Sequence, residues 1–243
     1  MSLHDQFLAV RDDLRSCLLE RESAIDNALL ALLSSEHFLM LGPPGTAKSL
    51  LVRAVCARID GAQYFEKLMT AFTVPEELFG PVDLVGYADR GEYRRIATGA
   101  MQQAHIVDLE EVFKANSAIL NTLLAIMNER LYHEVGMPPQ RVPLLSLFAS
   151  SNETPQDASL RALDDRFLLR EVVGYVQEDT SFVSLVTAPL DINSVQATLT
   201  LSEIQQAQQA VQQVKGTPEV LQALLTLRQA LSAEGIVVSD RKW

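Results

Sequence analysis

The stretch "GPPGTAKS", residues 42–49, holds the residue types that a phosphate site requires. Gly45 lets the backbone come close to a phosphate group, Lys48 brings a positive charge to the outer phosphates, and Ser49 offers a hydroxyl to Mg²⁺. The amides of the loop and the N-terminus of the following helix also point at an anion. An ordinary Gly/Pro turn is the alternative, but the strand before the loop and the Lys-Ser pair favour phosphate binding.

One position departs from the general pattern GxxxxGK[ST], because Ala47 stands where the second glycine is expected. Alanine is tolerated there if residue 47 has helical backbone angles rather than a positive φ, which glycine adopts at little cost. On that condition the loop is predicted to keep its phosphate-binding shape.

A second group of reactive side chains lies in "AHIVDLEEVFKAN", residues 104–116, which is typical of a buried strand that ends in carboxylates. In one register Asp108 holds the metal and Glu110 activates water, and both lie on one face because side chains alternate along a strand. In the other register Glu110 and Glu111 form the pair. Asp108 then lies further back in the strand, where a buried carboxylate is costly unless it is paired or hydrogen-bonded.

Strands that alternate with helices are expected to position these groups in a parallel α/β sheet. The apolar run "HFLML" leads into the phosphate loop, and "LLSLFASSN" forms a later strand that ends at Asn152. Ligands of such sheets bind at the carboxyl ends of the strands, so Lys48, the acids near residue 110 and Asn152 should meet at one edge. Asn152 is expected to orient water there, or to cap the strand end.

Helical spacing and turn signals predict the other elements. Residues 3–33 are expected to form two helices, the second capped by Ser23, and residues 117–130 another helix. Two hairpins are expected, one around "ADRG" and one with a Gly/Pro-rich tip after residue 130.

No strong strand signal remains after about residue 176. Two helices are predicted there, one capped by Ser202 and one capped by Thr217 with Pro218 at its first position. The chain is therefore divided into an α/β nucleotide-binding domain, residues 1–175, and a small helical domain, residues 176–243.

The composition limits the class of protein. Of the 243 residues, 48% are hydrophobic, and the formal net charge is −11, which argues against a general nucleic-acid or anionic-membrane surface. Cys17 and Cys56 lack metal-ligand spacing and are expected to be reduced, buried thiols, as in a cytoplasmic protein. No apolar run approaches the roughly 18–20 residues of a membrane helix, so membrane insertion is not expected.

The motifs together resemble those of the AAA+ ATPases and, within them, the MoxR family. The resemblance follows the family's order along nearly the whole chain, in "LMLGPPGTAKSL", "TVPEELFGPVDL", "EVFKANSAILNTLLAIMNER", "FASSNE", "LDDRF" and "SDRKW". It implies a P-loop NTPase fold, in which helices cover both faces of a parallel sheet and a small all-helical lid domain follows. The likeness is greatest to the regulatory-ATPase branch with "GPPGxAKS".

The resemblance also implies roles for single residues. The nucleotide-binding positions of the loop are Gly45, Thr46, Ala47, Lys48, Ser49 and Leu50. Glu111 matches the glutamate that polarises water, and Asn152 matches the first sensor. Arg166 matches the arginine finger that reaches a neighbouring subunit, and Arg170, one turn further, is a second candidate for that duty. Arg241 matches the second sensor, on the lid.

Two departures from the family pattern bear on these roles. The family's acid strand ends in Leu-Asp-Glu, and matching the segment that follows puts Glu110 in place of the aspartate that holds the metal together with Ser49. The longer side chain is expected to weaken hydrolysis while nucleotide binding survives. Family members also continue past the position of Trp243, so the lid is expected to be incomplete at its C-terminus.

The resemblance implies an ATP-driven remodeller of protein complexes that forms a homo-oligomeric ring, most often a hexamer, with ATP and Mg²⁺ as cofactors. Its expected partner carries a von Willebrand factor A domain, and the two hairpins would line or rim the ring. The alternative is an ATP-dependent assembly switch that hydrolyses little, because its acid strand is atypical. A DNA-acting motor is disfavoured by the net charge of −11.

Overall fold

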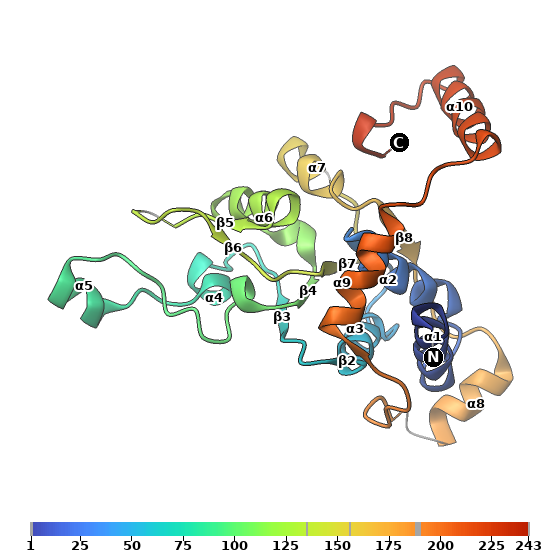
Figure 1. Ribbon diagram of the computed structural model, residues 1–243, viewed down its shortest axis with the longest axis horizontal. Helices are drawn as coiled ribbons and strands as arrows, with labels where there is room; N and C mark the ends of the chain where they lie inside the picture. Colours follow the sequence, from blue (N-terminus) through green and yellow to red (C-terminus); the bar gives the residue numbers. More distant parts are fainter. Residues whose placement is uncertain (1, 135, 156, 188–190, 243) are drawn as a thin grey trace.

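A five-stranded sheet forms the centre of the protein in the computed structural model (Figure 1). The structure describes residues 2–134, 136–155, 157–187 and 191–242. The strands lie in the spatial order β3 (Tyr64–Leu68), β4 (Ile106–Glu110), β7 (Ser146–Ser151), β1 (Phe38–Leu41) and β8 (Leu169–Val172). Every neighbouring pair is parallel. The predicted α/β class with a parallel sheet is therefore confirmed.

Helices connect the strands and cover both faces of the sheet (Figure 1). The α-helices are α1 (Leu3–Cys17), α2 (Glu22–Ser34), α3 (Lys48–Ala57), α4 (Pro75–Phe79), α5 (Leu84–Arg90), α6 (Ser117–Glu129), α7 (Ala158–Asp164), α8 (Asp179–Thr187), α9 (Leu201–Val211) and α10 (Pro218–Ala233). The shorter elements are β2 (Ile59–Asp60), β5 (Leu131–Tyr132), β6 (Gln140–Arg141), β9 (Leu199–Thr200), η1 (Met101–Gln103), η2 (Val112–Lys114) and η3 (Asp240–Lys242). Within the described ranges, no helix has the length and apolar character needed to cross a membrane.

Side chains of the central strands alternate between two apolar cores, one on each face of the sheet. Phe38 and Met40 of β1 belong to the core that contains α1, α2 and α3. Leu39, between them, belongs to the opposite core with α6. This alternation follows from the two-residue period of a strand, and burial on both faces explains the continuous apolar runs. Cys17 and Cys56 are free, buried thiols at the first core, as predicted.

The first predicted hairpin, around "ADRG", is wrong, because the segment before the turn folds into α5. The Asp83 carboxylate accepts a hydrogen bond from a first-turn amide at 2.9 Å, and Gly91 ends the helix with a φ of 66°. These two caps outweigh the strand preference of the apolar residues between them. An antiparallel bridge between Val82 and Arg95 still joins the two sides of the excursion.

The second predicted hairpin is confirmed. β5 and β6 pair in antiparallel direction, with Leu131 opposite Arg141 and Tyr132 opposite Gln140. Figure 1 shows that this hairpin and α5 extend on the same side of the molecule, away from α1 and α8.

The region after residue 176 is mainly helical, as predicted, apart from the short strand β9, and only part of it is packed against the rest of the chain. β9 pairs with β2, and α9 places Ile204 and Ala207 in the core shared with α2. The described side chains of α8 and α10, by contrast, are not buried. The boundary between residues 1–175 and 176–243 stays a prediction.

Helix caps were predicted with mixed success. Thr217 caps α10 as expected. Thr200 caps α9, two residues before the expected position, because it forms a reciprocal capping box with Glu203 that Ser202 cannot form from inside the helix. α2 begins one residue before the expected cap Ser23, which therefore lies within the helix.

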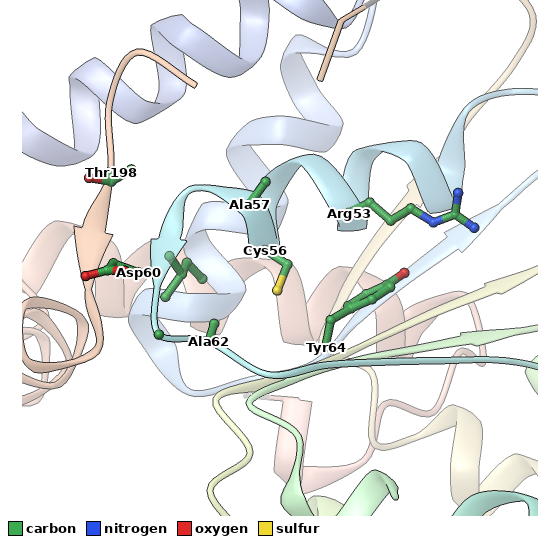
Figure 2. A pocket seen from close by; sticks show the side chains of 9 residues that line it. Arg53, Cys56, Ala57, Asp60, Ala62, Tyr64 and Thr198 are labelled. Carbon is green, nitrogen blue, oxygen red and sulfur yellow. The ribbon is translucent and has the colours of Figure 1, made fainter. Parts of the chain in front are cut away.

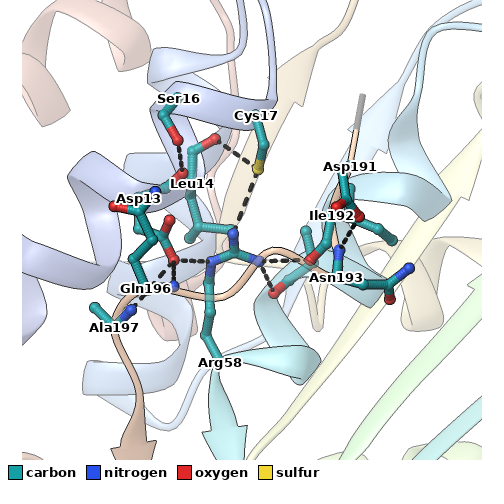
Figure 3. Close-up of polar contacts among 11 residues, drawn as sticks. Asp13, Leu14, Ser16, Cys17, Arg58, Asp191, Ile192, Asn193, Gln196 and Ala197 are labelled. Atoms are coloured by element: carbon teal, nitrogen blue, oxygen red, sulfur yellow. Dashed lines mark hydrogen bonds and ion pairs between the residues drawn. The ribbon is translucent and has the colours of Figure 1, made fainter. Parts of the chain in front are cut away.

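A buried ion pair fastens the segment before β9 to α1 and to the end of α3 (Figure 3). Arg58 Nε lies 2.9 Å from Asp13 Oδ2, and the two side chains are 0% and 3% exposed. The same carboxylate oxygen accepts hydrogen bonds from the amides of Gln196 and Ala197, at 3.1 and 3.4 Å. The guanidinium also donates to the carbonyl of Ile192 at 3.3 Å. Breaking a buried pair is costly because it leaves an uncompensated charge. The pair therefore stabilises the contact between these three distant parts of the chain.

Candidate functional site

The predicted phosphate loop joins the end of β1 to the start of α3. A Cβ atom on Gly42 would lie 2.1 Å from the carbonyl oxygen of Val173, so the loop passes the end of β8 too closely for any side chain. Gly45 has a φ of 78°, and no atom beyond the glycine and its two chain neighbours lies within 4 Å of the position that its Cβ would take. Its backbone is therefore open to a ligand, which is what a phosphate would need.

Ala47 has a φ of 63° directly before α3. The condition that residue 47 be helical is therefore not met, and the loop keeps the left-handed turn that glycine usually supplies at this position. The left-handed conformation costs a non-glycine residue roughly 1–2 kcal/mol. The loop accordingly carries backbone strain next to Lys48.

The Lys48 ammonium lies inside the loop. It donates hydrogen bonds to the carbonyls of Gly42 and Pro43, at 2.9 and 2.7 Å, and to Thr46 Oγ1 at 3.2 Å. Burial lowers the pKa of Lys48, although the negative charges of Glu111 and Glu110 oppose that shift. The ammonium is thus held between the loop and the acid strand, where it can face a bound anion.

The acid strand contacts the loop through Glu110. Its Oε1 atom accepts a hydrogen bond from the Ser49 hydroxyl at 2.6 Å. In the sheet, Glu110 lies opposite Ser150 of β7 at the carboxyl end of β4. The geometry therefore favours the register in which Glu110, rather than Asp108, stands beside the Ser49 hydroxyl.

Asp108 lies further back in β4 and is 1% exposed. The Tyr64 hydroxyl lies 3.4 Å from its Oδ2 atom, while Oδ1 has no hydrogen-bond partner. Burial raises the pKa of Asp108 to about 8, and the charges of Glu110 and Glu66 raise it as well. Asp108 is therefore a buried carboxyl set back from the edge of the sheet, and its surroundings favour the neutral form.

Glu111 follows β4 with a φ of 52°. Its Oε2 atom lies 3.4 Å from Lys114 Nζ and accepts no hydrogen bond. Its negative charge also acts on Lys48, so the carboxylate lies near the loop, as a group that polarises water would.

Asn152 follows β7 directly and lies in an exposed bend. β7 runs between β1 and β4, with Ser151 opposite Leu41 and Ser150 opposite Glu110. The ends of the three strands therefore lie side by side, which gathers Lys48, the acids and Asn152 at one edge of the sheet.

The predicted arginines have different surroundings. Arg166 lies 3.8 Å from the Asp165 carboxylate, and 21% of its side chain is exposed. Arg170 is tied within its own chain, because its guanidinium donates to the Asp164 carboxylate at 2.9 and 3.1 Å, to the Asp164 carbonyl at 2.6 Å and to the Phe167 carbonyl at 3.1 Å.

The backbone of Arg241 lies in η3, and its side chain is outside the described part of the structure. Its neighbours Ser239 and Lys242 contact the Asp165 carboxylate, at 2.7 and 3.5 Å. The end of the chain is therefore attached to the segment that contains Arg166.

Sequence reasoning missed an apolar cavity beside the loop. Its volume is about 290 Å³, and it is lined by Leu18, Leu19, Arg21, Gly45, Thr46, Ala47, Tyr175, Val176, Phe182 and Leu185. Three separate segments form its wall, so no local pattern could reveal it. The available signal was Arg21, a charged residue directly before the apolar helix α2.

A larger cavity of about 500 Å³ lies elsewhere, at the C-terminal end of α3 (Figure 2). It is lined by Arg53, Cys56, Ala57, Ile59, Asp60, Gly61, Ala62, Tyr64 and Thr198. Its one guanidinium, from Arg53, is already paired with Glu66 at 2.5 Å. The phosphate loop lies at the opposite end of the same helix, so this cavity is not part of the candidate site.

The side chains at the sheet edge fit Mg²⁺ that is bound together with a phosphate ligand. In the described ranges, no group of three or more His, Cys, Asp or Glu side chains could hold a metal ion by itself. Mg²⁺ usually keeps several waters and takes one or two protein oxygens together with phosphate oxygens. Ser49 and Glu110, in contact with each other, offer such oxygens beside the loop.

One family model and two archaeal proteins match most of this chain. The model of the MoxR domain in the MoxR-vWA-beta-propeller ternary systems matches residues 5–215. Two proteins of Methanocaldococcus jannaschii, MJ0079 and MJ0812, are 41% and 40% identical over 234 residues. These matches cover 96% of the chain, which spans 60% and 62% of the lengths of the two relatives.

Two further comparisons extend to other organisms. Chaperone MoxR1 of Mycobacterium tuberculosis is 27% identical over 169 residues, which cover 67% of this chain and 43% of that protein. The crystal structure of a candidate ATPase from Cytophaga hutchinsonii has a TM-score of 0.74 and 18% sequence identity, over 96% of this chain and 71% of that one. At this identity, the likeness shows a common fold.

Proposed function

Because the chain belongs to the MoxR family of AAA+ ATPases, we propose that it binds ATP with Mg²⁺ at the phosphate loop and hydrolyses it to remodel a protein partner. The observation that carries this proposal is the 2.6 Å contact between the Ser49 hydroxyl and the Glu110 carboxylate. It joins the loop to the acid strand at the carboxyl edge of the sheet, where ligands of parallel sheets bind. Phosphoryl transfer depends mainly on positioning and charge stabilisation, which side chains at this edge can provide.

Each side chain at the edge has a proposed task. Lys48 and the loop amides would bind the phosphates, and Ser49 with Glu110 would hold Mg²⁺, which neutralises phosphate charge when bound. Glu111 would polarise the attacking water, and Asn152 would orient it. The adenine base would lie in the apolar cavity beside the loop, and Arg241 keeps its predicted role as second sensor.

The proposal extends to a ring of identical subunits, most often a hexamer in the resembling family. Arg166 would then reach the nucleotide of a neighbouring subunit. Arg170 is the weaker candidate, because four hydrogen bonds hold its guanidinium to Asp164 and Phe167 of its own chain.

A partner with a von Willebrand factor A domain is part of the same proposal. Its support is the matched family model, whose description places MoxR domains in ternary systems with vWA and beta-propeller components. The chain spans about three fifths of the two archaeal relatives, so the activity of a whole protein of that length is also a proposal.

A second candidate function is an ATP-dependent assembly switch with weak hydrolysis. The observation that favours it is the residue type, since the acid beside the Ser49 hydroxyl is a glutamate, one methylene longer than the aspartate of the family pattern. Mg²⁺ requires near-octahedral geometry at short distances, so a displaced acid would impair its placement for hydrolysis more than for binding.

Two measurements with Mg²⁺ separate these functions, namely equilibrium ATP binding and steady-state phosphate release. A remodelling ATPase should release phosphate continuously, and Glu111→Gln should lower the rate at least about 100-fold while ATP affinity changes less than about threefold. Glu129→Gln, at an exposed position on α6, is the matched control. A switch should bind ATP and assemble, with the same low rate in wild type and in Glu111→Gln. Failure of the wild-type protein to bind ATP would contradict both functions.

A further inference from the structure

Arg21, between α1 and α2, connects the phosphate loop to the chain that leaves β8. Arg21 is 8% exposed. Its guanidinium donates to the carbonyls of Thr46 at 3.2 Å, Gly174 at 2.8 Å and Glu20 at 2.6 Å. A planar guanidinium carries five donors in fixed geometry, so it can hold two segments at a defined separation.

Glu20, the preceding residue, binds the next part of the same segment. Its Oε2 atom accepts the amide of Gln177 at 2.8 Å, and its Oε1 atom accepts the amide of Glu178 at 2.9 Å. These two amide donors lower the pKa of Glu20, because they stabilise its ionised form. Both carboxylate oxygens are therefore committed to the backbone of residues 177–178.

The segment that Glu20 and Arg21 hold forms one wall of the apolar cavity. Tyr175 and Val176 line the cavity directly, and Phe182 and Leu185 line it from α8. α8 has no buried side chain, and Phe182 and Leu185 are 59% and 44% exposed. Packing therefore contributes little to the position of this wall, and the hydrogen bonds to Glu20 contribute correspondingly more.

We propose that Glu20 and Arg21 form a clamp that sets the separation between the phosphate loop and the cavity wall, and so selects ligands that occupy both. The ligand class is a nucleoside triphosphate, with its phosphates on the loop and its base against the wall. Glu20 and Arg21 are positioning residues, because they act through the backbone of residues 46 and 174–178. This inference rests on the proposed binding of ATP.

The test compares a ligand that needs both parts with one that needs the loop alone. Equilibrium affinities for ATP and for inorganic tripolyphosphate, both with Mg²⁺, are measured on wild type, Glu20→Ala and Glu20→Gln. Glu20→Ala removes two charge-assisted acceptors, so ATP should bind at least about tenfold more weakly, while tripolyphosphate binding changes less than about twofold. Glu20→Gln keeps one acceptor oxygen and should lie between. Glu129→Ala, at an exposed glutamate on α6, is the control and should leave both affinities unchanged.

A change at Arg21 should give a different pattern. Arg21→Lys leaves one point charge that cannot reach the carbonyls of Thr46 and Gly174 together, so ATP and tripolyphosphate should both bind more weakly. Unchanged affinities in Arg21→Lys would overturn the part of the proposal that concerns Arg21.

The outcomes distinguish the clamp from the proposed function. Equal losses of ATP and tripolyphosphate binding in Glu20→Ala would overturn the clamp, since they indicate general damage to the site, and so would an unchanged ATP affinity. If Glu20→Ala does not fold, the ratio of affinities in Glu20→Gln decides in the same way. If the wild-type protein does not bind ATP, the proposed function and the clamp are both overturned. If it binds ATP, but the ratio of ATP to tripolyphosphate affinity is the same in the variants, the clamp alone is overturned.

Discussion

The phosphate loop and the acid strand form two halves of one candidate site, but they are held in different ways. In the loop, Lys48 binds the carbonyls of Gly42 and Pro43, six and five residues away. In the acid strand, the contact between Glu110 and Ser49 spans 61 residues and depends on the register of β4. Residue spacing alone therefore reveals the loop, whereas the identity of the acid that meets it is decided by the sheet.

The largest expected effect concerns the phosphate loop, whose contacts join residues close in sequence. Lys48→Ala removes the ammonium between the loop and the acids, so ATP affinity should fall at least about 100-fold, or about 2.7 kcal/mol. Isothermal titration calorimetry measures this change, with Lys67→Ala as the control, since Lys67 pairs with Glu77 away from the loop. Unchanged affinity in Lys48→Ala would show that the loop is not the phosphate site.

The next prediction concerns Asp108, which lies further back in β4 than the acid that contacts Ser49. The pKa of Asp108 is raised to about 8 in the folded protein, so the folded state holds its proton more tightly than the unfolded state. The free energy of unfolding should therefore fall as pH rises from about 4 to about 8. Asp108→Asn removes this dependence and should be more stable by at least about 2 kcal/mol at pH 8 and equally stable near pH 4.

Urea unfolding of wild type and Asp108→Asn across this pH range measures the difference, and phosphate release at pH 7 should stay within about threefold of wild type. Loss of hydrolysis in a folded Asp108→Asn protein would instead support the register in which Asp108 holds the metal and Glu110 activates water.

A smaller effect is expected when Glu110, the acid that contacts Ser49, is shortened to aspartate. Glu110→Asp withdraws the carboxylate by roughly 1.5 Å, which relieves the crowding of the Mg²⁺ shell. Phosphate release should rise about two- to fivefold, or reach half of its maximum at a lower Mg²⁺ concentration. A titration with Mg²⁺ measures both quantities. A lower rate of phosphate release together with a higher Mg²⁺ requirement would show that the longer side chain suits this site.

The smallest effect returns to the loop. Ala47→Gly relieves a positive φ of 63° and should raise the free energy of unfolding by about 0.5–1 kcal/mol. The gain is modest because glycine also increases the freedom of the unfolded chain. Thermal unfolding measures it, and a lowered midpoint would show that the alanine methyl makes contacts that outweigh the strain.

The strands and the parallel sheet could be predicted correctly, because side-chain periodicity determines them. The apolar runs of β1, β4 and β7 are buried on both faces, and the parallel sheet follows from their alternation with helices. Periodicity misled where short capping contacts compete with it. Asp83 and Gly91 turned an expected strand into α5, and Thr200 displaced Ser202 as the cap of α9.

The parts of the site that escaped prediction are those built from distant segments. The backbone angle of Ala47 is set by the loop as a whole, and the alanine itself pointed to the opposite conformation. Arg21 and the cavity wall meet only because β8 ends beside the loop, where Gly42 passes Val173. Such contacts have no signature in residue spacing.

The buried pair of Arg58 and Asp13 also links α1 to the solvent protection of a distant segment. The amide of Gln196 donates to the Asp13 carboxylate across 183 residues of chain, so it is shielded only while α1 stays in place. Hydrogen exchange at Gln196 and Ala197 should therefore report the undocking of α1, and these segments would open as one cooperative unit. The docking of α1 would thereby set the lifetime of a structure that lies 183 residues further along the chain.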